Sequence, residues 1–169
     1  MDWDKATDII LIASFLSLAV FAGLGLYQWI TRKSLKKVDR ELLYMPIPLA
    51  IMAIVYVVFD KFIVLATRPN GSGEPSFPSS HVMVVATIFF LITIILTKYI
   101  KNKTASIIIE IMMAALIILT CIGRVVSNMH SVGDVIGGLV FAFIFAEIYY
   151  LIIKKESKNA KHLHENHKR

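Results

Sequence analysis

The sequence predicts an all-α integral membrane protein, a helical bundle with about five transmembrane helices. Hydrophobic residues make up 57% of the 169 residues, whereas about 45–50% is usual for soluble chains. They gather in five segments, most of which approach the roughly 20 residues that a helix needs to cross a bilayer. The basic residues gather between and after these segments. A chain of this length is expected to form one domain.

The five apolar segments follow one another with short polar connections. They cover residues 9–30, 42–67, 82–97, 104–122 and 135–153. The third is short, but its helix reaches full length if it starts at Ser79. Pro46 and Pro48 fall in the first turns of the second segment, where proline is tolerated because those N–H groups have no helical partner. The first segment has an acidic leader and a long apolar core, so we expect it to stay in the mature protein rather than to be cleaved as a signal peptide.

Loop charges predict how the helices are oriented. Lysine and arginine are frequent after the first segment, between the third and the fourth, and in the C-terminal tail. By the positive-inside rule these regions are cytoplasmic. The N-terminus, with Asp2, Asp4 and Asp8, is then outside, and five crossings bring the C-terminus into the cytoplasm. We therefore expect a multi-pass plasma membrane protein with a membrane-embedded domain at 1–153 and a basic, disordered cytoplasmic tail at 154–169.

The composition argues against several function classes. The net charge of +6 comes from loops and tail beside apolar segments, which is typical of cytoplasmic loops near anionic headgroups. No nucleic-acid-binding module accompanies this charge, so nucleic acid is not an expected partner. The single cysteine, Cys121, excludes an intrachain disulfide and fits a small buried hydrophobic residue. The histidine-containing tail at 161–167 offers metal ligands, but solvated disorder is the favoured interpretation.

Three polar stretches interrupt the apolar pattern. They are Lys61-x6-Arg68-Pro69, Pro78-Ser79-Ser80-His81 and Arg124-x5-His130-x3-Asp134. All three lie at or near span ends that the predicted orientation places outside. Charged groups at such positions are costly and indicate a functional site. Cations, imidazoles and a carboxylate together suit the binding of a phosphate and the cleavage of its ester or anhydride bond.

The first stretch places two cations close to the outer surface. Lys61 and Arg68 are seven residues apart, about two helical turns, so the spacing predicts that they share a helix face. Pro69 then ends the helix and favours an extended backbone at Arg68. The alternative is that both residues are interfacial anchors at a helix end.

The second stretch predicts a helix start that faces the same surface. Ser79 or Ser80 is a suitable N-cap for the third span. A helix that begins there directs free N–H groups and the positive end of its dipole outward, which favours phosphate binding. His81 lies in the first turn. Alone it is more often structural, but beside a phosphate it can act as a general acid.

The third stretch has the most specific spacing. His130 and Asp134 are one turn apart, so the carboxylate can bond one imidazole nitrogen and raise the basicity of the other, as a nucleophilic histidine requires. Ser131-x-x-Asp134 also fits a capping-box-like helix start, in which Asp134 bonds backbone donors instead. The two interpretations are compatible because a carboxylate has two oxygens. Arg124, which follows Gly123, can make bidentate contacts with phosphate oxygens.

This arrangement resembles the type 2 phosphatidic acid phosphatase family of integral membrane lipid phosphatases. The family's pattern is Lys-x6-Arg-Pro, Pro-Ser-Gly-His and Ser-Arg-x5-His-x3-Asp, and the match runs from residue 61 to residue 138. Two positions depart from it: Ser80 replaces glycine, and Gly123 replaces serine. The family usually has six spans, and the apolar segments of this chain predict five, one fewer before the first motif.

The resemblance implies a role for each matching residue. His130 is the expected nucleophile that forms a phosphohistidine, Asp134 orients it, and His81 protonates the leaving oxygen. The expected phosphate ligands are Lys61, Arg68, Ser79, Ser80 and Arg124. Water then cleaves the intermediate, and the reaction requires no metal or other cofactor. The departures at Ser80 and Gly123 are expected to alter phosphate binding without abolishing activity.

The expected substrate is a membrane-anchored phosphate, because the site opens outward at the headgroup level. The Ser-Phe-Pro-Ser-Ser-His run and the short outer loops look most like the small bacterial undecaprenyl pyrophosphate phosphatases, which favours a polyprenyl (undecaprenyl) diphosphate. Phosphatidic acid, phosphatidylglycerophosphate and transfer of the phosphoryl group to another lipid are alternatives. A vanadate-dependent haloperoxidase and a non-enzymatic lipid carrier are more remote ones.

Overall fold

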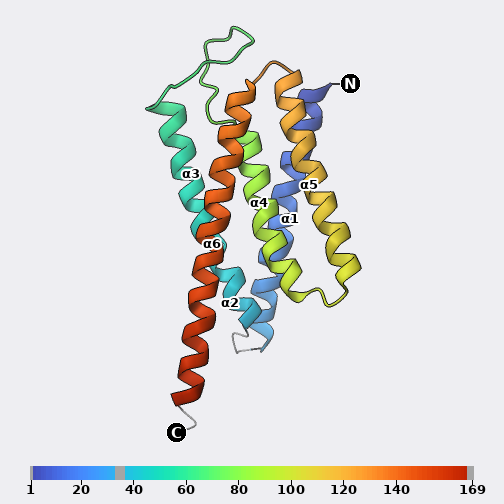
Figure 1. Ribbon diagram of the computed structural model, residues 1–169, viewed down its shortest axis with the longest axis vertical. Coiled ribbons are helices and arrows are strands. Elements are labelled where there is room, and N and C mark those ends of the chain that lie inside the picture. The colour runs from blue at the N-terminus through green and yellow to red at the C-terminus, as the bar shows by residue number, and fades with distance from the viewer. Residues whose placement is uncertain (1, 33–36, 167–169) are drawn as a thin grey trace.

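The computed structural model describes residues 2–32 and 37–166 of the chain, which form a bundle of helices (Figure 1). The helices are α1 (Trp3–Arg32), α2 (Lys37–Tyr44), α3 (Pro46–Lys61), α4 (Ser80–Tyr99), α5 (Lys103–Val126) and α6 (Val132–Asn166). Within these ranges there is no β-strand, and Thr67 and Pro75 form an isolated bridge. The predicted all-α fold is confirmed.

The described residues contain five helical stretches that are long and apolar enough to cross a membrane. They are Trp3–Gly23, Glu41–Lys61, Ser80–Thr97, Lys103–Val126 and Val132–Glu156. The second combines the end of α2 with α3, and Pro46 is the first residue of α3, as the sequence predicted. The number of spans and their order are therefore as expected.

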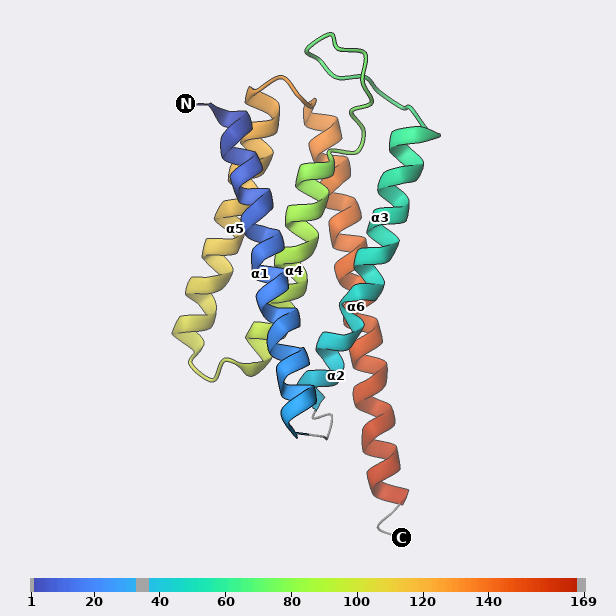
Figure 2. The ribbon, with the colours of Figure 1, turned by 180° about the vertical axis from the view of Figure 1, so that it is seen from behind.

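Helix α4 is the centre of the bundle, and it packs against α6, α5 and α1 (Figures 1 and 2). More than half of its span is buried. Its fully buried residues include Val85, Ile88 and Leu91. A helix that is apolar all round belongs in such a position. The outer helices instead expose large apolar side chains, Ile12 of α1 and Ile111 of α5 among them, as expected for surfaces that face lipid.

A glycine in α6 allows this helix to approach the start of α4. A Cβ at Gly138 would lie 2.8 Å from the carbonyl oxygen of Ser79, closer than real Cβ atoms come. The Ser79 N–H also donates to the Asp134 carbonyl oxygen at 3.0 Å. Small residues permit such close helix contacts in membranes. The second and third polar stretches are thereby fixed against each other.

The two ends of the bundle differ in composition. The N-terminus, the α3–α4 loop and the α5–α6 loop lie at one end, and the α4–α5 connection and the C-terminus lie at the other (Figure 1). The three polar stretches belong to the first end, and the basic C-terminal stretch of α6 belongs to the second. The positive-inside rule assigns the basic end to the cytoplasm, and this orientation stays a prediction.

The expected shared helix face of Lys61 and Arg68 is wrong. Helix α3 ends at Lys61, and the chain then turns back on itself. The Arg68 N–H donates to the Glu74 carbonyl oxygen, and the Ser76 N–H donates to that of Ala66, both at 2.9 Å. Two glycines with positive φ close the turn between them, at positions 71 and 73. These loop hydrogen bonds replace the helical ones that the spacing predicted.

The tail also differs from the expected disorder. Helix α6 continues to Asn166, so the described part of 154–169 is helical. After Gly138 the sequence contains no glycine or proline, and lysine, glutamate and alanine are good helix formers. The Tyr44 hydroxyl donates to Glu156 at 2.9 Å, which ties the start of this extension to α2.

Candidate active site

His130 lies in the short connection between α5 and α6, and its ring is held by the backbone. Its side chain is buried, and its own N–H donates to the Arg124 carbonyl oxygen at 3.1 Å. Ring atom Nδ1 lies 2.9 Å from the Ser76 carbonyl oxygen. A carbonyl can only accept, so Nδ1 carries the proton and Nε2 keeps its lone pair. Burial, followed by the charge of Arg124, lowers the pKa of His130 to about 4, so the ring is neutral at pH 7.

Asp134 makes the helix-start contacts that the sequence left open. Its Oδ2 accepts the Ser131 N–H at 2.7 Å, and the Ser131 hydroxyl accepts the Asp134 N–H at 3.2 Å. This is a reciprocal capping box. Oδ2 lies 4.0 Å from His130 Nδ1, too far for a hydrogen bond. The Ser76 carbonyl therefore orients the imidazole directly, and Asp134 acts on it only through its charge.

Several buried polar atoms at this end of the bundle have no hydrogen-bond partner among the described residues. They are Arg68 Nε, Ser76 Oγ, Ser79 Oγ, Arg124 Nε and His130 Nε2. Buried polar groups are rarely left without partners, and a cluster of them calls for an explanation. Four are donors that a phosphate oxygen can accept from, and the fifth is the lone pair of a neutral imidazole. The cluster matches what attack on a bound phosphate requires.

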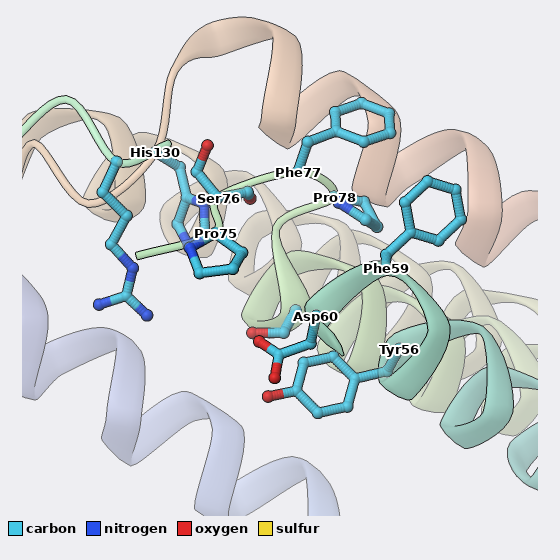
Figure 3. Close-up of a pocket in the computed structure, with 10 residues that line it drawn as sticks. Tyr56, Phe59, Asp60, Pro75, Ser76, Phe77, Pro78 and His130 are labelled. Carbon is cyan, nitrogen blue, oxygen red and sulfur yellow. Dashed lines mark hydrogen bonds between the residues drawn. The ribbon is translucent and has the colours of Figure 1, made fainter. Parts of the chain in front are cut away.

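Part of this cluster lines a small cavity beside His130. The cavity has a volume of about 30 Å³, and Arg68, Ser76 and His130 are among its lining residues. Figure 3 shows Ser76 and Pro75 next to His130, with Tyr56 and Asp60 of α3 on the other side. Phe59 of α3 packs edge to face on Phe77, with the ring centroids 5.8 Å apart. Such aromatic pairs are favourable and hold the loop against α3.

The start of α4 adds backbone donors to this end. Ser79 is the N-cap residue, as the sequence predicted, and it is fully buried. Its hydroxyl makes no capping bond, so it stays available together with the first N–H groups of α4. Helix N-termini favour anions for this reason. Ser80 is the first residue of the helix and also lines the cavity.

Lys61 and Arg68, the two cations of the first polar stretch, differ in their burial and in their distance from the cavity. The Lys61 side chain is 69% exposed and pairs with Asp60 at 2.8 Å; it does not line the cavity. Exposed pairs of this kind contribute little to stability. Arg68 is partly buried, pairs with Glu74 at 2.7 Å and lines the cavity. The structure therefore brings Arg68 to His130 and leaves Lys61 at the surface.

Arg124 occupies the last turn of α5 and is almost fully buried. Its Nη1 donates to Asp4 at 2.5 Å and lies 3.5 Å from the Thr7 hydroxyl. Gly123 explains how α1 comes so close, because a Cβ there would lie 2.5 Å from Thr7 Cγ2. The departure from serine at this position thus gives α1 access to the site.

The His81 side chain faces α1. Its Nε2 lies 2.8 Å from Asp8 Oδ1. The imidazole lines a groove of about 510 Å³ between α1, α3 and α4. Most of the groove is apolar, with Leu11, Phe15 and Met52 among its residues. Tyr56 and Ser80 line both this groove and the cavity beside His130. The apolar groove and the polar cavity beside His130 are therefore neighbours.

Sequence reasoning missed three residues of this end. Asp4 and Asp8 were used only to orient the protein, although their spacing of four residues was a sign that they share a helix face. Ser76 gave no signal, because any residue can supply a carbonyl oxygen.

Within 2–32 and 37–166 no group of three or more His, Cys, Asp or Glu side chains could hold a metal ion.

Comparisons with known proteins give a family match and a structure of similar fold. A model described as the PAP2 superfamily matches residues 56–158. Among solved structures, the chain is similar to one described as "Crystal structure of the first transmembrane PAP2 type phosphatidylglycerolphosphate phosphatase from Bacillus subtilis". The identity is 21%, the TM-score is 0.71, and the match covers 92% of this chain and 79% of that one. No curated protein matches.

Proposed function

The chain belongs to the PAP2 superfamily, as its motifs led us to expect, and on this premise we propose that it hydrolyses a lipid phosphate or diphosphate through a phosphohistidine on His130. The observation that carries the proposal is the neutral, buried His130, whose Nε2, like four buried donors at the same end of the bundle, has no partner among the described residues. A neutral imidazole has the lone pair that attack on phosphorus requires.

In the first step, Nε2 of His130 forms a bond to phosphorus while the bond to the leaving oxygen breaks. The Nδ1–H bond to the Ser76 carbonyl stabilises the positive charge that the ring then acquires. Arg68, Arg124 and the Ser79 hydroxyl hold the equatorial oxygens, together with the N–H groups of the α4 start. Fixed donors of this kind stabilise the charge that spreads over these oxygens in the transition state.

His81 completes the cycle as the proton carrier. It gives a proton to the leaving oxygen, so that a lipid alcohol or lipid phosphate departs neutral or less charged. It then takes a proton from the water that attacks the phosphohistidine, and inorganic phosphate leaves. Atoms and charge balance without a metal ion, so we propose a metal-independent hydrolase.

The apolar groove supports a lipid as the substrate. It opens among α1, α3 and α4, and it shares Tyr56 and Ser80 with the phosphate cavity. A headgroup phosphate at His130 can thus continue into a hydrocarbon chain in the groove. With the site at the predicted outer face, the substrate would come from the outer leaflet of the plasma membrane.

Two lipid classes have comparable support. The run from Ser76 to His81 favours undecaprenyl diphosphate, and the structural match to a phosphatidylglycerolphosphate phosphatase favours phosphatidylglycerophosphate. Phosphatidic acid fits the same site. The phosphohistidine does not determine the acceptor, so transfer to a second lipid is a further outcome that an experiment can detect.

The test is phosphate release by purified protein in mixed micelles, with these three lipids compared in parallel. We expect release that is insensitive to EDTA, and its loss in His130→Ala. His162→Ala, on the C-terminal stretch of α6, is the matched control and should keep full activity. Activity that persists in His130→Ala would contradict the mechanism. Absence of release by the wild type on all three lipids would favour the non-enzymatic carrier.

A further inference from the structure

Helix α1 contributes two carboxylates to the candidate site, although none of its residues belongs to the three motifs. Asp4 and Asp8 are four residues apart, so both face the same side of α1. That side carries Asp4 to Arg124 and Asp8 to His81, at 2.5 and 2.8 Å. Each carboxylate thus meets one of the groups that the proposed reaction uses.

The end of α1 that carries these carboxylates is firmly packed. Thr7 lies between them, is almost fully buried, and donates its hydroxyl to the Asp4 carbonyl oxygen at 2.9 Å. Its methyl group occupies the space that Gly123 leaves. Helix α1 also packs along α4 and α5 (Figure 2). The backbone of α1 between the two aspartates is therefore held against the bundle at Thr7, while their carboxylates stay 38% and 54% exposed.

The Asp4 contact determines which edge of Arg124 remains for a phosphate. Asp4 and Thr7 take Nη1, while Nε is buried and has no partner among the described residues. A guanidinium binds an oxyanion in bidentate fashion along one edge. Asp4 therefore leaves the Nε edge free, and it also balances a buried positive charge that is costly when alone.

The Asp8 contact determines which nitrogen of the His81 imidazole remains for the substrate. Its Nε2 faces Asp8 Oδ1, so the ring cannot rotate freely at the start of α4. A histidine ring has two nitrogens, and engagement of Nε2 leaves Nδ1 for the leaving oxygen. A carboxylate beside the ring also interacts favourably with its protonated form, the form that a proton donor needs.

We propose that Asp4 and Asp8 are positioning residues of the active site, Asp4 for the phosphate-binding edge of Arg124 and Asp8 for the proton-donating ring of His81. The inference rests on the proposed function. The alternative is that the two carboxylates compete with the substrate: they would pair with Arg124 and His81 in the free protein, and a bound phosphate would have to displace them. The two models give opposite expectations for phosphate affinity.

The test uses the full-length protein with Asp4→Asn or Asp8→Asn, and Asp2→Asn as the matched control. Asp2 lies at the same end of the chain, but it pairs with the exposed Lys5 at 2.9 Å. Each variant is assayed for kcat and KM on the lipid that the wild type hydrolyses. Inorganic phosphate is titrated in parallel, and its binding is measured by calorimetry.

For Asp8→Asn we expect kcat to fall at least about tenfold, part of the roughly 10²–10⁴-fold that general acid catalysis contributes, with little change in KM. The loss should largely disappear with p-nitrophenyl phosphate, whose leaving group needs no proton. A merely structural defect would affect both substrates equally and would overturn the assignment. An unchanged kcat would overturn it as well.

For Asp4→Asn we expect binding of inorganic phosphate to weaken about tenfold, a loss of roughly 1.4 kcal/mol, while Asp2→Asn keeps wild-type affinity. If Asp4→Asn does not fold, Asp4→Glu retains the charge and still moves the guanidinium, so the same direction is expected. Unchanged or tighter phosphate binding would overturn the proposal. Because this measurement needs no turnover, it decides the role of Asp4 even if no lipid is hydrolysed.

Discussion

The two histidines of the site are held by partners of different kinds. His130 is buried, and its Nδ1 faces a backbone carbonyl oxygen, which carries no net charge. His81 is partly exposed, and its Nε2 faces the carboxylate of Asp8. The carbonyl oxygen fixes the proton on Nδ1 of His130 and leaves the lone pair on its Nε2, whereas Asp8 engages Nε2 of His81 and leaves its Nδ1 for proton transfer. The difference teaches how one site can hold a nucleophile and a proton donor of the same residue type.

The largest expected effect comes from exchanging each ring in turn. His130→Asn should abolish phosphate release from a lipid and from p-nitrophenyl phosphate alike, because both reactions need the nucleophile. His81→Asn should reduce lipid turnover by roughly 10²–10⁴-fold and the aryl phosphate reaction much less. Steady-state kinetics on the two substrates check this. Equal losses for both variants on both substrates would mean that the histidines do not have separate roles.

A second prediction concerns the contact that places the α4 start beside the α5–α6 loop. Gly138→Ala puts a methyl group 2.8 Å from the Ser79 carbonyl oxygen, which cannot move without shifting the first turn of α4. Overpacking of this kind costs about 1–3 kcal/mol. We expect a lower melting temperature and a clear loss of activity.

The matched control for Gly138→Ala is Gly23→Ala in α1. No atom lies within 4 Å of a Cβ at Gly23, and alanine is the better helix former. Thermal unfolding in detergent should therefore leave Gly23→Ala unchanged or slightly more stable. If Gly138→Ala behaves in the same way, the close contact between α4 and α6 does not position Ser79.

Residues that act through a specific side-chain group could be predicted from the sequence. Residues that act through their position in the fold could not. The motifs identified Arg68, Ser79, Arg124 and His130, since guanidinium, hydroxyl and imidazole groups are specific to those residues. The five spans followed from apolar length alone. The carbonyl oxygen of Ser76 could not be predicted, because every residue has one.

Spacing alone misplaced one pair of residues and left the partner of another open. Spacing placed Lys61 and Arg68 on one helix face, but the hydrogen bonds of the turn between Ala66 and Ser76 ended the helix earlier. Spacing also left two partners open for Asp134, and only the three-dimensional arrangement showed that Ser131 takes the short contact. Local sequence patterns therefore indicate possible contacts of a residue, and the tertiary structure determines which of them form.

A third prediction tests why the chain has glycine at 123. Gly123→Ser restores the family's residue but places its Cβ 2.5 Å from Thr7 Cγ2. We expect destabilisation of about 1–3 kcal/mol and weaker lipid turnover, because α1 must move away from Arg124. Thr7→Ser removes the methyl group and keeps the hydroxyl, so the double variant should regain most of the lost stability. A double variant no better than Gly123→Ser would show that the contact with Thr7 is not the reason for the glycine.

The smallest expected effect is the absence of a titration. Burial and the charge of Arg124 lower the pKa of His130 from 6.5 to about 4, so its ring should stay neutral as the pH falls from 7 to 5. The ¹⁵N ring signals of labelled protein, assigned with His130→Asn, should therefore be constant over this range, whereas an unperturbed histidine with a pKa of about 6.5 titrates within it. Arg124→Gln should raise the midpoint only in part, because burial is the larger cause and remains. A His130 ring that gains its proton near pH 6.5 would contradict the prediction, because burial would then not hold the imidazole neutral at the pH of the reaction.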